Sequence, residues 1–210
     1  LPDLLPAPVS SAAIDAAARL LSNGKKTALL LRGVALYGAG LEAAGRVQAK
    51  TGARLLCDTF APHAELGAGR VPVERIPYFA EQIVDFLKDF EQIIFVGAKP
   101  PVSFFAYPGK PSWCVPEGSH LSYLAHAHRD GAQALAALAD SLGAPARSPV
   151  RIPRQLPELP NGPLTALGVA QVIAAMTPEN VIFADEAATA SLPLLSTMAR
   201  ARPHTHLPLT

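Results

Sequence analysis

Short apolar runs that alternate with helix-like segments are the feature that most limits what this chain can fold into. Lys26 to Arg32 (KTALLLR) and Gln92 to Val96 (QIIFV) are continuous apolar runs, typical of strands that are covered on both faces. Arg54 to Cys57 and His120 to Leu124 are two further candidate strands. Because parallel strands are joined by helical crossovers of one hand, the alternation predicts a doubly wound α/β domain with a parallel sheet.

The segments that flank these runs have apolar residues at the spacing of an amphipathic helix. They are Ser11 to Ser22, Leu41 to Thr51, Phe79 to Phe90 and Gly131 to Leu142. Ser10 or Ser11 is suited to cap the first helix, and Gly52 is suited to end the second. Each candidate strand therefore has a candidate helix within crossover distance.

Proline clusters predict where the domains begin and end. Proline makes up 21 of the 210 residues, about twice the usual ~5%. We expect residues 1–10 to be a linker from a preceding domain, residues 11–146 to form the α/β domain, and residues 147–163 to form an extended proline-rich linker. Residues 164–210 are then expected to begin a C-terminal domain.

The last segment follows the same alternation but is too short to form a domain. Leu164 to Met176 and Ala190 to Ala199 are candidate helices on either side of a candidate strand, Val181 to Ala184. A single αβα unit leaves its strand unpaired and its apolar faces open. We therefore expect an incomplete second α/β segment whose domain continues beyond Thr210.

Charge and cysteine usage exclude several classes of protein. The 18 basic residues nearly balance the 17 acidic residues, so no long-range field favours nucleic acid or an anionic membrane. The two cysteines, Cys57 and Cys114, are far apart and are expected to be buried thiols in a cytoplasmic protein. No apolar run reaches the roughly 18 residues that a membrane helix needs.

A glycine motif suggests one candidate site, for a nucleotide. Residues 38–43 (GAGLEA) follow the pattern G-x-G-x-x-A, and Asp58 follows the next candidate strand. Gly33, Gly38, Gly40 and Asp58 would then serve a freestanding Rossmann-like nucleotide-binding module. However, five residues (GVALY) separate Arg32 from the motif. Glycines at such positions more often serve only to turn the chain and let the helix pack closely.

Two histidine pairs suggest a metal site, but each lacks further ligands. His126 and His128, like His204 and His206, alternate as in an extended strand. No Cys, Asp or Glu stands at the spacing that would complete a tetrahedral site. We therefore expect loop or surface histidines, and no metal bound by this chain.

Three aromatic residues occupy the loop after the strand QIIFV. The loop, residues 97–109 (GAKPPVSFFAYPG), carries Phe104, Phe105 and Tyr107. Open α/β sheets bind ligands at the carboxyl ends of their strands. The loop either walls a ligand site or packs its aromatic rings on its own domain.

The order of segments resembles a known family. Residues 27–62 (TALLLRGVALYGAGLEAAGRVQAKTGARLLCDTFAP) and 77–101 (PYFAEQIVDFLKDFEQIIFVGAKPP) resemble the central, Rossmann-like domain of thiamine diphosphate-dependent decarboxylases and carboligases. Within this group, the segments look like those of acetolactate synthase large subunits and are also similar to benzoylformate decarboxylase. The resemblance implies a homo-oligomeric enzyme, a dimer or tetramer, with three α/β domains. It would use thiamine diphosphate and Mg²⁺ to process a 2-oxo acid.

The same resemblance implies roles for particular residues. Residues 178–190 (PENVIFADEAATA) are similar to the start of the diphosphate-binding domain, which points to Glu186 and Thr189 as cofactor-binding residues. Phe105 matches the position of a catalytic histidine in benzoylformate decarboxylase. A phenyl ring cannot transfer protons, so Phe104, Phe105 and Tyr107 are expected to form an apolar wall beside the substrate.

The resemblance also implies what this chain lacks. The loop at residues 97–109 departs from the sequence found in flavin-binding acetolactate synthases, so FAD is not expected. The family's catalytic glutamate would lie in a preceding domain, and no Gly-Asp-Gly occurs in the sequence. We assign no catalytic residue here and expect the chain to be inert alone.

Overall fold

The computed structural model describes residues 5–187, 189 and 191–208 and divides the chain into two compact units. The first unit is built from the chain up to Thr59 together with Val73–Pro149. The second is built from Phe60–Pro72 and from the chain from Val150 onward. The domain predicted for residues 11–146 differs from the first unit chiefly at residues 60–72, which belong to the other unit, while residues 5–10 and 147–149 also join the first unit.

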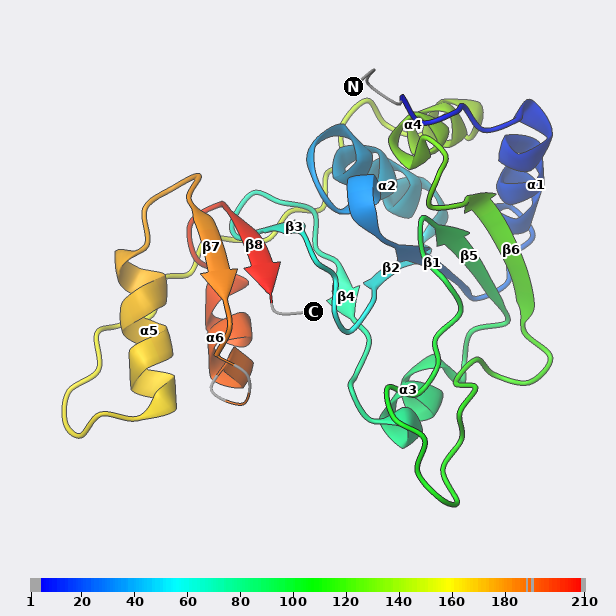
Figure 1. Cartoon of the computed structure of the whole chain (residues 1–210). Coiled ribbons are helices and arrows are strands. Elements are labelled where there is room, and N and C mark those ends of the chain that lie inside the picture. The colour runs from blue at the N-terminus through cyan, green and yellow to red at the C-terminus, as the bar shows by residue number, and fades with distance from the viewer. Residues whose placement is uncertain (1–4, 188, 190, 209–210) are drawn as a thin grey trace. The chain divides into compact units, whose positions relative to one another are not determined.

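A five-stranded parallel sheet forms the centre of the first unit (Figure 1). Its strand order is β4-β2-β1-β5-β6. The bounds are Thr27–Leu31 for β1, Arg54–Cys57 for β2, Glu74–Arg75 for β4, Gln92–Val96 for β5 and His120–Ala125 for β6. Every residue of β1 and β5 is buried. This confirms that the two apolar runs are strands covered on both faces.

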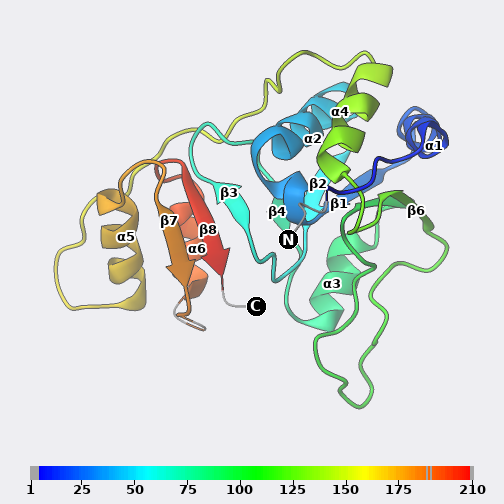
Figure 2. The same ribbon diagram turned by 45° about the horizontal axis from the view of Figure 1, so that its top comes forward.

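Helices cover both faces of this sheet, which confirms the doubly wound α/β class (Figure 2). Three of them pack together on one face: α1 (Ser11–Leu21), α2 (Gly38–Thr51) and α4 (Gly131–Ser141). The helix α3 (Ala80–Leu87) lies on the other face, where Ile83 and Leu87 pack against Phe95. A short 3-10 helix, η1 (Gly33–Leu36), joins β1 to α2.

Local signals explain most helix ends. The Ser10 hydroxyl accepts a hydrogen bond from the Ala13 N–H at 3.3 Å and caps α1. Gly52, at φ 75°, ends α2 and donates its N–H to the Gln48 carbonyl at 2.8 Å. The predicted start of α2 at Leu41 is three residues late, because Gly38 and Gly40 already lie in the helix. The predicted end of α3 at Phe90 is three residues too far.

A second, three-stranded sheet belongs to the second unit, with the order β3-β8-β7. Its strands are β3 (Ala64–Leu66), β7 (Ile182–Asp185) and β8 (His204–Pro208), and its helices are α5 (Ala166–Met176) and α6 (Ser191–Met198). The strand β7 pairs in parallel with β8, which pairs antiparallel with β3. The expectation that the strand near Val181 lacks a partner is therefore wrong, because β8 lies beside it.

The proline-rich segment at residues 147–163 has neither helix nor strand. Its later part is held to the second unit by backbone hydrogen bonds. The Ile152 N–H donates to the Arg70 carbonyl at 2.9 Å, and the Gln155 N–H donates to the Arg200 carbonyl at 3.0 Å. Its proline spacing explains the lack of regular structure, since proline has no N–H to donate.

Candidate functional site

Three neighbouring strands of the five-stranded sheet end beside one another at its carboxyl edge. Arg32 follows β1, Asp58 follows β2 and Gly97 follows β5. The Arg32 guanidinium forms an ion pair with the Asp58 carboxylate. Burial raises the pKa of Asp58, and the hydrogen bond from Arg32 partly offsets that rise. The Asp58 carboxylate is thus already engaged within the protein.

The glycines of the nucleotide hypothesis have structural roles at this edge. Gly33 and Gly38 have φ of 60° and 52°, values that L-residues rarely adopt. A Cβ built on Gly40 would lie 2.0 Å from the Val34 carbonyl oxygen, so this position requires glycine for the contact between η1 and α2. Gly33, Gly38, Gly40 and Asp58 therefore all have a role without a nucleotide, and their role in nucleotide binding stays a prediction.

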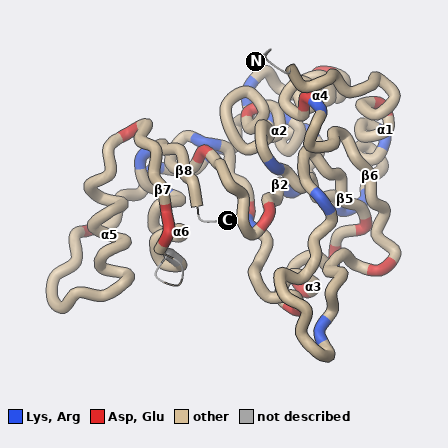
Figure 3. The backbone as a smooth tube through the Cα atoms, viewed as in Figure 1, with Lys and Arg blue, Asp and Glu red and all other residues tan. Residues whose placement is uncertain are grey.

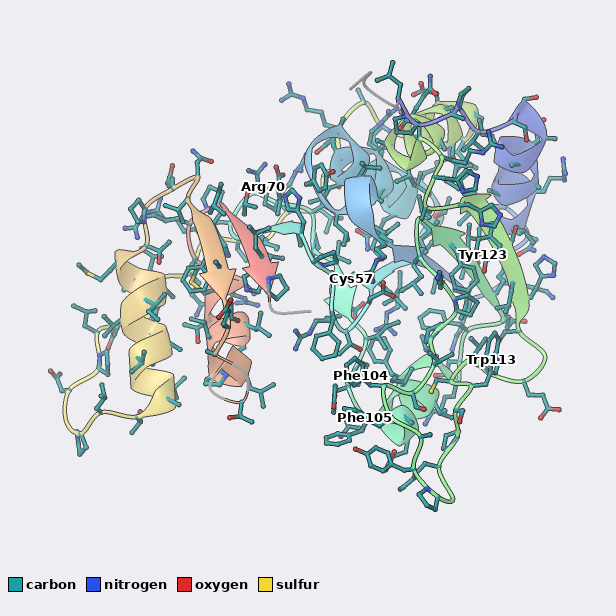
Figure 4. The ribbon with its side chains drawn as sticks, in the orientation of Figure 1. Cys57, Arg70, Phe104, Phe105, Trp113 and Tyr123 are labelled. Atoms are coloured by element: carbon teal, nitrogen blue, oxygen red, sulfur yellow. The ribbon has the colours of Figure 1, made fainter. Side chains whose placement is uncertain are left out.

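The loop after β5 folds back on itself as a ladder. Val102 and Trp113 form an antiparallel bridge. The Ser103 N–H donates to the Ser112 carbonyl at 2.8 Å, and the Cys114 N–H donates to the Pro101 carbonyl at 3.1 Å. Figure 4 shows Phe104 and Phe105 side by side on one limb of this loop. The loop is therefore held by its own backbone and projects its aromatic rings from a defined frame.

Five rings form what we call the aromatic cluster, and they come from this loop and from the residues before α3. Its members are Tyr78, Phe79, Phe104, Phe105 and Tyr107, with neighbouring ring centroids between 4.7 and 6.1 Å apart. Phe105 is 50% exposed and Tyr107 is 54% exposed. The loop does pack its rings on one another, but it leaves half of their surface open. The aromatic cluster is therefore partly packed on its own domain and partly available as the wall of a ligand site.

The aromatic cluster lines a shallow hollow of about 230 Å³. Its polar lining includes Ser103, Lys110 and Glu81, and the Lys110 ammonium lies 2.6 Å from the Glu81 carboxylate. Tyr78 and Phe79 were not predicted to belong to this site. In the sequence, the only feature that could have indicated them is an aromatic pair directly after Pro77 and before an amphipathic helix.

The two histidine pairs differ in their surroundings. His126 and His128 are exposed beyond β6, where His126 stacks on Tyr123 at a centroid distance of 4.3 Å; their prediction as surface residues is confirmed. His204 and His206 are 1% and 4% exposed in β8, so the same prediction is wrong for them. Within the described residues, no group of three or more His, Cys, Asp or Glu side chains is placed to hold a metal ion.

His204 is buried with only one of its ring nitrogens satisfied. Its Nδ1 lies 2.8 Å from the Arg202 carbonyl oxygen, which can only accept, so Nδ1 donates. Among the described residues, Nε2 has no hydrogen-bond partner. Burial lowers the pKa of His204, and the positive charge of Arg70 lowers it further.

This environment predicts that acid destabilises the second unit. The ordinary pKa of a histidine side chain is 6.5. Below that pH, His204 binds a proton more readily in the unfolded chain than in the folded chain. Stability therefore falls as pH falls, by up to about 1.4 kcal/mol per pH unit. His204→Asn keeps a donor for the Arg202 carbonyl but does not titrate. Urea unfolding at pH 7.5 and 5.5 should show a smaller loss for H204N than for the natural chain. Equal losses would contradict the role of His204.

The predicted diphosphate residues lie where β7 ends. Glu186 and Thr189 are exposed between β7 and α6, whereas Asp185, the last residue of β7, is buried. The exposed Thr189 hydroxyl can donate a hydrogen bond to an anion. The Glu186 carboxylate can only accept, so beside a diphosphate it needs a cation between them. The residues present therefore fit a diphosphate that is accompanied by a divalent cation.

Three further predictions from the sequence concern membrane helices, the distribution of charge and the two cysteines. Within the described residues, each helix is too short or too polar to cross a lipid bilayer. Figure 3 shows basic and acidic positions interspersed along the chain. Cys57 and Cys114 are both buried, as predicted, and burial raises the pKa of Cys57 to about 12.

One known protein is similar in sequence to nearly the whole of this chain. No protein-family model matches it. It is 41% identical over 208 residues to a Mycobacterium tuberculosis protein named "Putative acetolactate synthase large subunit IlvX". The match covers 98% of this chain but 40% of that relative.

Solved structures share the fold. The thiamine diphosphate-dependent 4-hydroxybenzoylformate decarboxylase of Rhodococcus jostii RHA1 superposes with a TM-score of 0.70 at 17% identity, over 97% of this chain and 41% of that one. Benzoylformate decarboxylase of Polynucleobacter necessarius superposes with a TM-score of 0.66 at 15% identity, over 97% of this chain and 41% of that one. The resemblance drawn from the sequence motifs is confirmed: the chain is similar to 40% of an acetolactate synthase large subunit-like relative, and it shares its fold with thiamine diphosphate-dependent decarboxylases.

Proposed function

We propose that this chain supplies the central domain, and the first part of the diphosphate-binding domain, of an acetolactate synthase-like enzyme. The parent enzyme would decarboxylate a 2-oxo acid and either release an aldehyde or join the product to a second carbonyl compound. The observation that carries this proposal is the 41% identity to the Mycobacterium tuberculosis relative over 208 residues. A cytoplasmic location and a homo-oligomeric parent, dimer or tetramer, are parts of the same proposal.

The first unit would act as scaffold and as one wall of the active site. The half-exposed rings of Phe104, Phe105 and Tyr107 offer an apolar surface that would exclude water from the substrate. The phenyl rings of Phe104 and Phe105 carry no exchangeable proton, so they cannot take part in proton transfer. Substrate placement, not proton transfer, is therefore the role proposed for the aromatic cluster.

The turn after β7 would hold part of the cofactor. Thiamine diphosphate, when bound, would supply the nucleophilic chemistry that decarboxylation of a 2-oxo acid needs. The Thr189 hydroxyl would donate a hydrogen bond to the diphosphate, and the Glu186 carboxylate would face the accompanying Mg²⁺. FAD is not part of this proposal, because the loop at residues 97–109 carries the aromatic cluster instead of a flavin-type sequence.

We expect the 210-residue chain to be inert alone. With thiamine diphosphate, Mg²⁺ and either pyruvate or benzoylformate, it should release no carbon dioxide above the rate without protein, since no catalytic glutamate or Gly-Asp-Gly element is assigned in it. The full reading frame, assayed in parallel, should turn over one of the two substrates. Turnover by the 210-residue chain would overturn the proposed division of roles, and an inactive full-length protein would overturn the proposed reaction.

An apolar surface on the second unit supports the proposal that its domain is larger. Large apolar side chains are exposed on α5, β7 and α6 and just before α5; they are Leu164, Leu167, Val169, Val172, Met176, Ile182 and Leu192. Among the described residues, β7 pairs with a strand on one side only, so it is an edge strand of its sheet. Ile182, on β7, is 71% exposed. A strand and helices from the parent protein would cover such a surface.

This proposal predicts different amide exchange in the two forms of the protein. In the full-length protein, backbone amides of Ile182 and Ala184 that face the open edge of β7 should exchange at least tenfold more slowly than in the 210-residue chain, because a new strand would bond them. Amides of β5, inside the first sheet, serve as the unchanged reference. Equal exchange of β7 in both forms would mean that this edge stays open.

The alternative function is a freestanding nucleotide-binding module, favoured only by the motif at residues 38–43. It predicts that the 210-residue chain binds NAD(H) in a calorimetric titration. The roles found for Gly40 and Asp58 within the protein lead us to expect no binding. Saturable binding of NAD(H) would favour the alternative.

A further inference from the structure

A buried acid and a buried histidine meet beneath the turn that carries the proposed diphosphate residues. Asp185 is 6% exposed and ends β7, and His206 is 4% exposed in the neighbouring β8. The His206 Nε2 lies 3.5 Å from the Asp185 Oδ2. Burying a carboxylate is costly unless its oxygens have partners, so this contact needs a reason beyond packing.

The sheet brings the two side chains together. In the parallel register, Phe183 lies opposite His206 and Asp185 lies opposite Pro208. Residues two apart in a strand share a face, so Phe183 and Asp185 point to the same side. The Phe183 ring stacks on the His206 imidazole at a centroid distance of 6.0 Å. The imidazole is thus held between an aromatic ring and the carboxylate.

The second carboxylate oxygen of Asp185, Oδ1, stabilises the turn that follows β7. The Asp185 Oδ1 accepts a hydrogen bond from the Ala187 N–H at 2.9 Å. A side chain that binds the backbone two residues ahead forms a tight local turn. This turn places Glu186 on the surface while its neighbour Asp185 stays buried. One carboxylate therefore links the core of the second unit to the start of the connection that reaches Thr189.

We propose that Asp185 and His206 are positioning residues, which set the turn at Glu186 in its binding conformation before the cofactor arrives. The inference rests on the proposed function, because it concerns the diphosphate site at Glu186 and Thr189. A turn that is already ordered loses less conformational freedom on binding. The pair should therefore strengthen cofactor binding without taking part in the reaction.

The test uses the full-length protein and two variants of His206. His206→Phe keeps a ring against Phe183 but removes the polar contact with Asp185, and His206→Gln keeps a side-chain N–H donor. We expect H206F to weaken thiamine diphosphate binding, measured by calorimetry with Mg²⁺ present, by about tenfold or more. H206Q should stay within about threefold of the natural protein. At saturating cofactor, kcat of H206F should remain within about twofold.

A second measurement reads the turn itself and needs no cofactor. In the 210-residue chain, the Ala187 amide should exchange faster in H206F and in Asp185→Ala than in the natural chain, while amides of α5 keep their protection. If the natural full-length protein binds thiamine diphosphate and H206F binds it equally well, the positioning role is wrong. If the natural protein does not bind the cofactor at all, the proposed function fails instead. Unchanged Ala187 exchange in both variants would also overturn the inference.

Discussion

Replacing Gly40 by alanine should destabilise the first unit by about 3 kcal/mol, at the upper end of the cost of overpacking. The added Cβ would lie 2.0 Å from the Val34 carbonyl oxygen and 2.9 Å from the Val34 carbonyl carbon. Both atoms belong to the backbone of η1, so no side-chain rotation relieves the contact. The helix α2 would have to move away from η1. Urea unfolding of the purified variant measures the loss directly.

Gly38→Ala is the matched control for this substitution. Gly38 has open space around its Cβ position but a φ of 52°, so alanine there carries only the backbone cost, about 1–2 kcal/mol. G40A should therefore be clearly less stable than G38A. A G40A variant as stable as the natural chain would show that η1 and α2 can separate without loss. It would also reopen the nucleotide hypothesis, in which Gly40 is needed only near a ligand.

Replacing Phe95 by alanine should cost about 3–5 kcal/mol of folding free energy, the usual loss for a buried phenylalanine. Phe95 is fully buried in β5 and lies between the neighbouring strands β1 and β6. Its ring is 5.0 Å from that of Tyr123, so the truncation also removes an aromatic contact. The cavity would open against the face of the sheet that α3 covers.

Phe95→Leu is the control, because leucine fills most of the volume and should cost less than half as much. Chemical unfolding of both variants, followed by tryptophan fluorescence, gives the comparison. Trp113 lies on the loop that follows β5 (Figure 4), so it reports on the same unit. A loss below about 1 kcal/mol for F95A would mean that the core collapses into the cavity.

The candidate site was partly predictable. Phe104, Phe105 and Tyr107 stand together in a loop whose place at a strand end follows from the strand pattern, so their grouping could be predicted from neighbouring positions. Tyr78 joins the aromatic cluster only because α3 packs on the same side of the sheet, which depends on the path of the chain. The contact between Asp185 and His206 depends on the pairing of β7 with β8, and no local pattern indicates it.

Local patterns predict the parallel α/β class, the two central strands and the resemblance to thiamine diphosphate-dependent enzymes, because continuous apolar runs and motif order are local properties of the chain. That residues 60–72 join the second unit, and that His204 and His206 are buried, emerges only from the packed structure. Both outcomes follow from β8, whose partners β3 and β7 are distant from each other along the chain. Strand pairing across such distances depends on packing and backbone hydrogen bonds that a single segment does not carry.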